Sequence, residues 1–592
     1  MGRLDDELAE ERAAREAEGL AREAHLPPAD GELTDLVSND YLGLSRDPEI
    51  IEAMARATRT HGAGARAARL LGGGSPLDRD AERAVAGWLG AEDALLMPSG
   101  YQSNLALIPA LVGPGDVILS DRLVHASLID GARLSRAQVL IHDHLDLGHL
   151  ERLLRTAEGA RRKLVLTEGV FSMDGTRPDL AEMASLCAEH GAGLVVDEAH
   201  SAGLLGPDGA GAWAELEGEA REPALLARLV TGGKALGVGG AFIVGSSSLR
   251  THLVDRGRGF VFSTGVAPAI AGGLIAAIER VRSSSHLRER VLGMARRLTS
   301  SLGLPEPGAA IVPVMVGEPG AALEAAKELR SRGFEVRAVR PPTVPVGTAR
   351  LRIVCHAGDD PGKMDELAVA LKGMGLPGSS AATPPATKPL VVVGTDTGIG
   401  KTVSSAILVR QLAREGPVAY WKPVQTGDES DTEEVRRLTA GVDVHFHEPT
   451  FHFALPASPH EAAAAENTSL RVEDVDADLE RHRQRPGTLV IELAGGLNVP
   501  LTDSFLQADW LSRHRPRLVL IARSGLGTLN HTLLTVEALA RRGLVPEALW
   551  LVGPEHESNR ETLAARTGIP VVEVPTFEQI DPEALAEFTG AG

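Results

Sequence analysis

The sequence contains only two cysteines, Cys187 and Cys355, among its 592 residues. Two cysteines cannot build a disulfide framework or a cysteine-rich metal site, and such sparse use indicates a reducing compartment. We therefore expect both cysteines to be core residues.

Positive charge is also scarce, because 60 Lys and Arg residues face 80 Asp and Glu residues, which gives a formal net charge of -20. Non-specific binding to nucleic-acid phosphates or to anionic lipids depends on surplus Lys and Arg. The charge balance therefore predicts no nucleic-acid partner and no membrane partner.

No segment predicts export or membrane insertion. The amino terminus mixes acidic residues with Arg12 and Arg15, and so lacks the basic-then-apolar order of a secretory signal. The longest run of small residues, 265–278, is shorter than the ~20 residues that span a bilayer, and Glu279 ends it. We expect a cytoplasmic protein.

The length is several times the ~100 to 200 residues of one domain, so the chain is expected to hold more than one. Residues 375–388 are mostly small residues and prolines, which cannot bury enough apolar surface to hold a fixed shape. We predict a first domain over 1–374, a linker over 375–388 and a second domain over 389–592.

Both predicted domains have an α/β pattern. In the first, the apolar runs 163–167 and 193–196 alternate with helix-length segments such as 179–190. In the second, similar runs return at 518–521 and 548–552. This alternation predicts βαβ units and a largely parallel sheet. The sequence shows no internal repeat.

Three residues of the first domain indicate a site for pyridoxal 5'-phosphate. Lys234 lies among glycines after the strand-like segment 228–230, Asp197 follows the apolar run 193–196, and His200 comes shortly afterwards. This cofactor needs a lysine for a Schiff base, an acid at its ring nitrogen and a group at its phenolic oxygen. A lone lysine beside glycines is usually a solvated loop residue, but this order and context favour the cofactor.

Six motifs carry a resemblance to the α-oxoamine synthases: Ser38–Leu44, Arg69–Gly74, Ser99–Asn104, Glu168–Gly175, Val195–His200 and Thr231–Gly237. The resemblance covers about residues 30 to 370. It implies the type I aminotransferase fold and the condensation of an amino acid with an acyl thioester, with loss of carbon dioxide. The sequence departs from the family pattern at Ser75 and at Cys355-His356, in the region expected to contact the acyl substrate.

The same resemblance implies a role for each cofactor residue. Gly100 and Tyr101 would lie at the cofactor phosphate, His125 on the ring, Ser172 against the cofactor, Asp197 at the ring nitrogen, His200 and Thr231 at the polar edge and phosphate, and Lys234 on the Schiff base. Thr264 lies in a segment that reaches the cofactor phosphate of a neighbouring subunit in that family.

Arg352 resembles the family arginine that pairs with the amino-acid carboxylate, a bidentate task that suits a guanidinium. His125 is also expected to contact the substrate. The alternative for Arg352 is an ordinary surface ion pair.

The second domain contains a phosphate-binding loop, Gly394–Thr402, between a predicted strand at 390–393 and a predicted helix at 404–414. Its glycines are separated by one residue more than the usual spacing. Backbone N–H groups and the helix amino end can face phosphate in this setting. The predicted nucleotide contacts are Gly398, Ile399, Gly400, Lys401, Thr402 and Val403, with Lys401 on phosphate oxygens and Thr402 on Mg²⁺.

Three more motifs, Tyr420–Gly427, Ile491–Leu497 and Ala522–Thr532, resemble dethiobiotin synthetase, and the resemblance covers about residues 389 to 580. That family makes a cyclic urea from a vicinal diamine, carbon dioxide and ATP. The resemblance implies that Asp431 and Glu492 join Thr402 as nucleotide and Mg²⁺ ligands, that Lys422 stabilises a carbamate, and that Thr426 contacts the diamine. The alternative for Asp431 is a solvated acidic loop.

Together the two resemblances predict a bifunctional enzyme of biotin biosynthesis that combines the activities of the 8-amino-7-oxononanoate synthase and dethiobiotin synthetase families. L-Alanine would condense with a pimeloyl thioester of coenzyme A or acyl carrier protein. Related synthases use glycine or serine with other acyl groups, so a different α-oxoamine synthase activity is the alternative. A separate aminotransferase must convert the first product into the diamine, and we expect a homodimer.

Two other functional classes fit the sequence less well. Asp197–His200 spells a helicase box, but in helicases the phosphate loop precedes that box within one domain, whereas here it follows the box across a linker. A scaffold with one inactive half is disfavoured because both sites retain their lysines, Lys234 and Lys401.

Overall fold

The computed structural model describes residues 3–17, 21, 33–216, 224–341, 343–345, 347–376, 388–414, 416–483, 485–577 and 579–588. Most of the predicted linker, 377–387, lies outside the described residues. The chain divides into two compact units, of which the first comprises Met1–Leu147 and Ala160–Ala381 and the second Gly148–Gly159 and Ala382–Gly592. No helix in the described ranges is both long enough and apolar enough to cross a bilayer.

The first unit is built on a seven-stranded sheet with the order β2-β8-β7-β6-β5-β3-β4. Strand β8 is antiparallel to both of its neighbours and the other pairs are parallel, so the predicted, largely parallel sheet is confirmed. The strands are β2 (Asp93–Met97), β3 (Val117–Asp121), β4 (Gln138–His142), β5 (Lys163–Glu168), β6 (Gly193–Asp197), β7 (Leu225–Thr231) and β8 (Ala241–Gly245).

Helices cover this sheet. The core between the helices and the sheet contains Leu107 and Leu128 from two helices and Leu166 from β5. The α-helices of this unit up to residue 283 are α1 (Arg3–Ala17), α2 (Pro48–His61), α3 (Pro76–Leu89), α4 (Gly100–Leu111), α5 (Ala126–Ser135), α7 (Leu180–Glu189), α8 (Ser247–Arg256), α9 (Arg258–Val261) and α10 (Pro268–Ser283). Helix α6 (Leu147–Thr156) lies almost entirely in the segment Gly148–Gly159, which is assigned to the second unit. Short 3-10 helices lie at Leu44–Arg46, Arg69–Leu71, Pro207–Gly209 and Ala212–Glu215.

A smaller antiparallel sheet follows in the same unit, with the order β11-β12-β9. Its core includes Leu298, Leu351, Leu367 and Cys355. Cys187 is buried in α7, so the expectation for both cysteines is confirmed. The elements are β9 (Ile311–Gly317), β11 (Arg337–Val339), β12 (Ala349–Val354), α11 (Ser285–Leu302), α12 (Pro319–Ser331) and α13 (Pro361–Gly373), with β1 (Thr34–Asp35) paired to β10 (Phe334–Glu335).

The second unit has a seven-stranded sheet in which every pair is parallel, with the order β16-β14-β18-β13-β21-β22-β23. The strands are β13 (Leu390–Gly394), β14 (Val418–Trp421), β16 (Val444–His447), β18 (Thr488–Gly496), β21 (Arg517–Arg523), β22 (Ala548–Val552) and β23 (Val571–Val574). Shorter strands are β15 (Val424–Thr426), β17 (Phe451–Phe453), β19 (Pro500–Thr502) and β20 (Phe505–Leu506).

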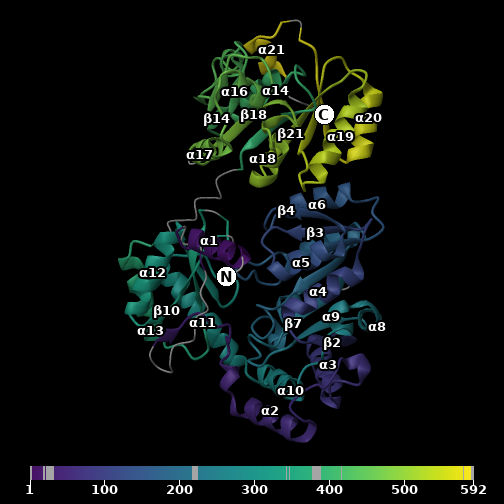
Figure 1. Ribbon diagram of the computed structural model, residues 1–592, viewed down its shortest axis with the longest axis vertical. Helices are drawn as coiled ribbons and strands as arrows, with labels where there is room; N and C mark the ends of the chain where they lie inside the picture. The colour runs from purple at the N-terminus through teal and green to yellow at the C-terminus, as the bar shows by residue number, and fades with distance from the viewer. Residues whose placement is uncertain are drawn as a thin grey trace. The chain divides into compact units, whose positions relative to one another are not determined.

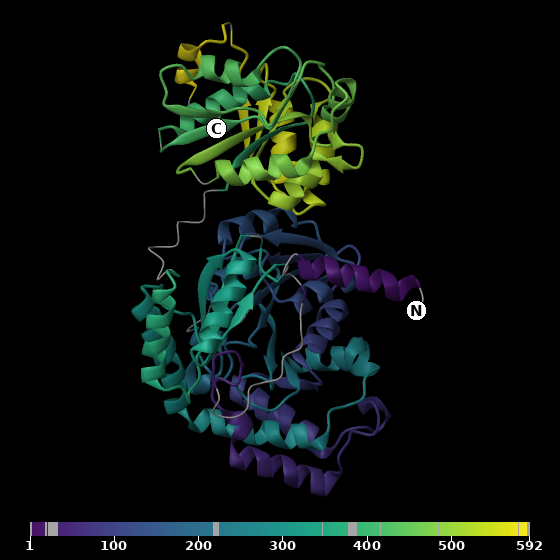
Figure 2. The same ribbon diagram turned by 60° about the vertical axis from the view of Figure 1, so that its left-hand side comes forward.

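Alternation along β13 places apolar side chains on both faces of this sheet. Val391 and Val393 pack with residues of α17 and α18, whereas Leu390 and Val392 pack with residues of α14. Figures 1 and 2 show the resulting helices on either side of the sheet. The helices are α14 (Lys401–Leu412), α15 (Asp431–Leu438), α16 (Pro459–Ala465), α17 (Val472–His482), α18 (Gln507–His514), α19 (Thr528–Ala540), α20 (Glu557–Thr567) and α21 (Pro582–Glu587).

Candidate active sites

A cavity of about 140 Å³ lies at the carboxyl ends of β5, β6 and β7 in the first unit. Ligands bind at this edge in open α/β sheets because the loops that follow the strands converge there. Most of the predicted cofactor residues line this cavity. Its lining is Gly100, Tyr101, His125, Ser127, Glu168, Asp197, Ala199, His200, Leu229, Thr231 and Lys234.

Lys234 lies in the loop between β7 and β8. At Gly232, any side chain would collide with the carbonyl oxygen of Gly239, so this position requires glycine. The Nζ atom of Lys234 is 2.6 Å from Nε2 of His200. Burial lowers the pKa of Lys234 to about 8, although Asp197 opposes the change. Lys234 is therefore the neutral, nucleophilic amine more often near neutral pH than an ordinary lysine.

Asp197, at the end of β6, is held by two hydrogen bonds. Its Oδ2 accepts from Nδ2 of Asn104 at 3.0 Å and its Oδ1 accepts from the N–H of Ala199 at 3.0 Å. The carboxyl group is buried, with 5% exposure of the residue. Asn104 was not a predicted site residue, although it ends the motif Ser99–Asn104.

His200 is buried between Lys234 and Tyr41. Its Nδ1 lies 2.5 Å from the hydroxyl oxygen of Tyr41, on the opposite side of the ring from Lys234. Burial lowers the pKa of His200 well below its usual value, and the positive charges of Lys234 and Arg352 lower it further. The imidazole is therefore neutral at physiological pH.

His125 caps the amino end of α5 and joins the cavity to β5. Its backbone N–H donates to Oε1 of Glu168 at 2.6 Å, while its Nδ1 contacts the hydroxyl of Ser127 at 2.8 Å. Burial raises the pKa of Glu168 well above its usual value, and the nearby charge of Asp197 adds to the effect. Neither Glu168 nor Ser127 was a predicted site residue.

Gly100 and Tyr101 begin α4, whose amino end faces the cavity. A Cβ at Gly100 would lie 3.6 Å from Cβ of Thr231, so the two backbones approach closely. Tyr101 is 44% exposed and its hydroxyl donates to Asp130. N–H groups at a helix amino end favour bound anions, so this corner suits a phosphate.

Three predicted residues do not line the cavity. Thr264 pairs with Ala68 in an isolated β-bridge, and Ser172 is buried within the loop that follows β5. Arg352, on β12, donates from Nε to the carbonyl oxygen of Ser172 at 2.7 Å and from a terminal nitrogen to Oδ1 of Asn39 at 3.1 Å. Arg352 is 9% exposed, so it does not form the surface ion pair considered as the alternative.

In the second unit, the phosphate-loop residues connect β13 to α14. Gly398 and Gly400 have φ angles of 66° and 91°, which L-residues rarely adopt. Lys401 donates from Nζ to the carbonyl oxygen of Asp396 at 3.0 Å. Burial lowers the pKa of Lys401 to about 8, against the opposing charge of Glu492.

The predicted metal ligands meet beside this loop. The hydroxyl oxygen of Thr402 lies 2.8 Å from Oδ1 of Asp431 and 3.1 Å from Oε1 of Glu492, so its single proton faces two carboxylates. Lys422 donates to the same Oε1 at 3.2 Å and also to Asp431. Burial opposes the charge of Lys422, but the two carboxylates raise its pKa overall. Two carboxylates and a hydroxyl are the oxygen ligands that Mg²⁺ prefers.

Ser405 and Tyr420 hold the other oxygen of Glu492. Their hydroxyls donate to Oε2 at 2.8 Å and 3.0 Å. Both residues were missed by sequence analysis, because a small residue inside α14 and an aromatic residue inside β14 have the pattern of ordinary core positions.

A separate cavity of about 370 Å³ opens beside the phosphate loop. Among the predicted nucleotide residues it includes Gly398, Ile399, Gly400 and Val403, whereas Lys401, Thr402, Asp431 and Glu492 lie outside its lining. Thr426 lies on β15 and is not part of this lining either. The remaining lining residues, which were not predicted, are Arg523, Val552, Gly553, Pro575, Thr576, Phe577 and Ile580.

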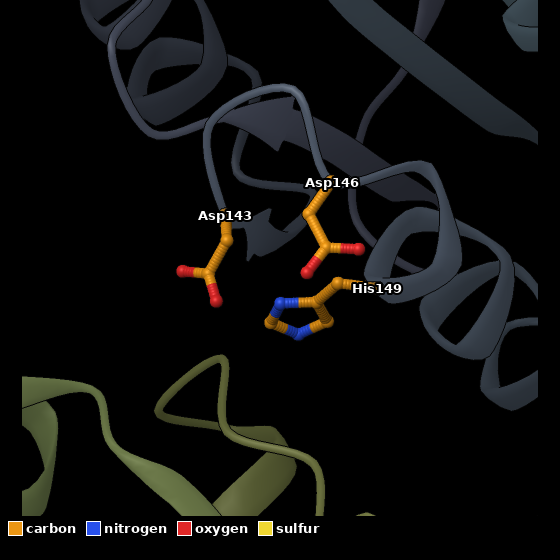
Figure 3. Close-up of side chains that lie close together, drawn as sticks. All are labelled: Asp143, Asp146 and His149. Atoms are coloured by element: carbon orange, nitrogen blue, oxygen red, sulfur yellow. The ribbon is translucent and has the colours of Figure 1, made fainter. Parts of the chain in front are cut away.

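One more group of potential metal ligands lies outside the predicted sites. Figure 3 shows Asp143, Asp146 and His149, whose ligand atoms lie within 4.8 Å of one another. It is the only such group of His, Cys, Asp and Glu in the described part of the chain. Asp143 forms an ion pair with Arg122 at 3.2 Å. We assign no metal to this group, because neighbouring acidic groups are common without one.

Comparison with known families matches both parts of the chain. A family described as "Aminotransferase class I and II" matches residues 31–371, which is more than half of the chain. A family described as "AAA domain" matches residues 388–584.

Similar proteins cover the first of these regions. The 8-amino-7-oxononanoate synthase of Alkalilimnicola ehrlichii is 42% identical over 387 residues, which are 62% of this chain and 98% of that protein. The enzyme of the same name from Maricaulis maris is 44% identical over 58% of this chain and 87% of that protein.

Among solved structures, a serine palmitoyltransferase from S. paucimobilis superimposes with a TM-score of 0.58 and 28% identity, over 63% of this chain and all of that chain. The predicted type I aminotransferase fold is thereby confirmed for the first unit, and the parallel sheet that follows the phosphate loop agrees with the fold predicted for the second. The chain therefore belongs to the aminotransferase class I and II family, and an AAA domain follows its aminotransferase region.

Proposed function

We propose that residues 1–374 form a pyridoxal phosphate-dependent 8-amino-7-oxononanoate synthase, which condenses L-alanine with a pimeloyl thioester. The observation that carries this proposal is the meeting of Lys234, Asp197 and His200 in one cavity. Relatives with that name are 42% and 44% identical. The serine palmitoyltransferase is only 28% identical, which favours alanine over serine as the amino acid.

The cavity residues fit this cofactor. A carboxylate, a neutral imidazole and an amine of lowered pKa face one space, as a ring nitrogen, a phenolic oxygen and an aldehyde carbon require. Asp197 would hold the ring nitrogen, His200 the phenolic oxygen and Lys234 the aldehyde carbon, with Gly100 and Thr231 at the phosphate. When bound, the cofactor supplies an electron sink for the α-carbon of the amino acid.

The residues of the chain then supply binding and proton transfer. Arg352 would pair with the alanine carboxylate, and His125 would lie over the ring. The Lys234 amine would take the α-proton, because its lowered pKa leaves it partly unprotonated. The α-carbon would then form a bond to the thioester carbonyl carbon as the thiol leaves, and loss of the carboxyl group as carbon dioxide gives the amino ketone.

We propose that residues 389–592, after a linker over 375–388, form a dethiobiotin synthetase that uses ATP and Mg²⁺. The supporting observation is the contact of Thr402 and Lys422 with the same oxygen of Glu492 beside a phosphate loop. Lys401 would hold phosphate oxygens, and Asp431 would join Thr402 and Glu492 on Mg²⁺.

In this unit one amine of a vicinal diamine would take up carbon dioxide as a carbamate, which Lys422 stabilises. ATP would phosphorylate a carbamate oxygen, and attack by the second amine would release phosphate and close the cyclic urea. Thr426 would contact the diamine.

The first activity is tested by supplying the purified protein with L-alanine and pimeloyl thioesters of coenzyme A and of acyl carrier protein. We expect carbon dioxide release that Lys234→Ala abolishes. Release with serine or glycine and another acyl thioester, but not with alanine, would instead establish a different α-oxoamine synthase.

The second activity is tested with 7,8-diaminononanoate, bicarbonate, ATP and Mg²⁺. We expect dethiobiotin and phosphate in equal amounts. With alanine and a pimeloyl thioester in place of the diamine, we expect no dethiobiotin, because a separate aminotransferase must first convert the ketone into an amine. Dethiobiotin formed without that enzyme would contradict this part of the proposal.

We also propose that the protein is a homodimer. Thr264 lies outside its own cavity lining, and nearby Phe262 and Leu71 are 73% and 81% exposed. A second copy would cover such apolar surface and receive Thr264 at its phosphate corner. Sedimentation velocity is expected to give twice the chain mass, whereas a monomer at micromolar concentration would refute it.

A further inference from the structure

A continuous chain of hydrogen bonds joins Lys234, the proposed Schiff-base lysine, to Arg352, the residue proposed to pair with the amino-acid carboxylate. Lys234 Nζ contacts His200 Nε2 at 2.6 Å, and His200 Nδ1 contacts the Tyr41 hydroxyl at 2.5 Å. The Tyr41 hydroxyl contacts Oδ1 of Asn39 at 3.2 Å, and Arg352 contacts the same oxygen at 3.1 Å. Tyr41 and Asn39 have no assigned role in the proposed reaction.

We propose that Tyr41 is a positioning residue, which fixes the tautomer of His200 and thereby keeps a lone pair of His200 directed at the Lys234 amine. The inference rests on the proposed function of the first unit only for the role of Lys234.

The direction of every hydrogen bond in this chain follows from its two ends. A guanidinium can only donate, so the Asn39 atom that faces Arg352 is the oxygen, and it accepts. The Tyr41 hydroxyl must then donate to Asn39, which leaves an oxygen lone pair of Tyr41 for an N–H at Nδ1 of His200. With its proton on Nδ1, His200 has a lone pair on Nε2, and the ammonium of Lys234 donates to it.

Burial favours this hydrogen-bond arrangement over arrangements that leave a polar group unpaired. Tyr41 is fully buried and His200 is 4% exposed, so unpaired groups at either site would be costly. Burial also disfavours the charged forms, because it raises the pKa of Tyr41 and lowers that of His200. Both residues are neutral, and the position of the imidazole proton is therefore the property that Tyr41 controls.

The charge on Lys234 depends on that proton. Burial and the positive charge of Arg352 disfavour the ammonium, whereas the carboxyl groups of Asp197 and Glu168 favour it. The lone pair on Nε2 of His200 also accepts a hydrogen bond from the ammonium, which stabilises the protonated form of Lys234. Without the Tyr41 hydroxyl, Nδ1–H loses its acceptor, and the tautomer with N–H directed at Lys234 becomes as favourable. We therefore expect loss of the hydroxyl to lower the pKa of Lys234.

The test measures Lys234 directly in cofactor-free protein. Pyridoxal 5'-phosphate is added, and the visible absorbance of its imine with the lysine, formed with loss of water, gives a second-order rate at each pH. The rate for the wild-type protein is expected to rise with a midpoint near the pKa of about 8. In Tyr41→Phe we expect the midpoint to fall by about half a unit or more.

Two further variants separate this role from a merely structural one. Asn39→Ala lets the Tyr41 hydroxyl turn to Nδ1 of His200, and should also lower the midpoint, which preserves the test if Tyr41→Phe does not fold. In a His200→Ala background, Tyr41→Phe should cause no further change. Trp88→Phe, which removes a partly buried hydrogen bond to the backbone carbonyl of Asp208 in the same unit, is the matched control and should leave the midpoint unchanged.

An unchanged midpoint in both Tyr41→Phe and Asn39→Ala would overturn the inference while leaving the proposed function intact. An equal shift from Tyr41→Phe with and without His200 would also overturn it, because the effect would then not pass through the imidazole. If the wild-type protein gave no visible imine at any pH, the proposed function of the first unit would fail, and the inference with it.

Discussion

The ammonium of Lys422 lies 3.2 Å from a carboxylate oxygen of Glu492, and the two residues are only 4% and 1% exposed. A buried pair of this kind is costly to break from one side, because the remaining charge has lost both water and its partner. The same carboxylate is a proposed Mg²⁺ ligand, so stability and metal binding depend on one group.

Lys422→Met is therefore expected to destabilise the second unit by about 3–5 kcal/mol in the absence of divalent metal. Mg²⁺ should restore more stability to the variant than to the wild-type protein, because the ion no longer competes with an ammonium for Glu492 and Asp431. Thermal unfolding with and without Mg²⁺ measures both effects.

The matched control for this prediction is Lys363→Met. Lys363 forms a solvent-exposed pair with Glu366 on α13, and exposed pairs contribute little. Equal melting of the Lys422 and Lys363 variants would show that the buried contact is not formed in solution.

Asp197→Asn should lower the rate of the proposed condensation by about 10²- to 10³-fold, because an amide does not provide the negative charge that stabilises a protonated ring nitrogen. Asn104 would still donate to the remaining carbonyl oxygen, so the fold should be retained. Steady-state rates with alanine and a pimeloyl thioester provide the measurement. Asp365→Asn, which alters an exposed pair with Arg297, should keep the wild-type rate; a similar loss there would point to a general effect on the protein.

Gly400→Ala should abolish nucleotide-dependent activity of the second unit and spare carbon dioxide release by the first. The φ angle of Gly400 is 91°, and an added Cβ would lie 2.9 Å from Cγ1 of Val552. Titration with ATP in the presence of Mg²⁺ should show weakened binding.

Gly293→Ala is the control, since Gly293 lies in α11 with open space at the Cβ position and should gain roughly 0.5–1 kcal/mol of stability. Unaltered ATP binding by the Gly400 variant would refute the phosphate-loop assignment.

The stability of the second unit should decrease between about pH 6.5 and pH 4. His447 stacks on His482 with ring centroids 3.6 Å apart, and burial together with the charge of His482 lowers the pKa of His447 to about 4. In the unfolded chain His447 binds a proton near pH 6.5, whereas in the folded chain it does so only near pH 4. The unfolded state therefore binds more protons between these values, and the free energy of unfolding decreases as the pH falls.

His447→Gln should flatten this part of the stability profile. Denaturant unfolding followed by tryptophan fluorescence is suitable, because Trp421 packs edge-on against His482 with centroids 4.9 Å apart. Substitution of the exposed His286 in the first unit should leave the profile unchanged. A wild-type profile that stays flat down to pH 4 would exclude the effect.

Residues at strand ends were the most predictable part of the first site. Asp197 and Lys234 follow apolar runs, and the carboxyl ends of parallel strands meet at one edge, so their proximity could be expected without coordinates. Tyr41 could not be placed in this way, because it lies 159 residues before its partner His200 and outside the strands of the main sheet.

The small antiparallel sheet was also not predicted. Strand β11 is only three residues long and its side chains are partly buried, so no apolar run marks this strand. The same limit applies to the second site, where Ser405 was missed because its polar contact with Glu492 forms inside a buried helix face. Sequence patterns report burial well, but the partner of a buried polar group depends on the assembled fold.

The guanidinium of Arg352 is already occupied by the Ser172 carbonyl and the Asn39 amide. A ligand can replace these two neutral acceptors only if it forms stronger hydrogen bonds with the guanidinium. A carboxylate does so, because it is negatively charged and presents two oxygens side by side. A primary amine without an acid group brings no such compensation. The contacts of Arg352 in the ligand-free protein would therefore favour the binding of amino acids over simple amines, which would otherwise also react with an aldehyde.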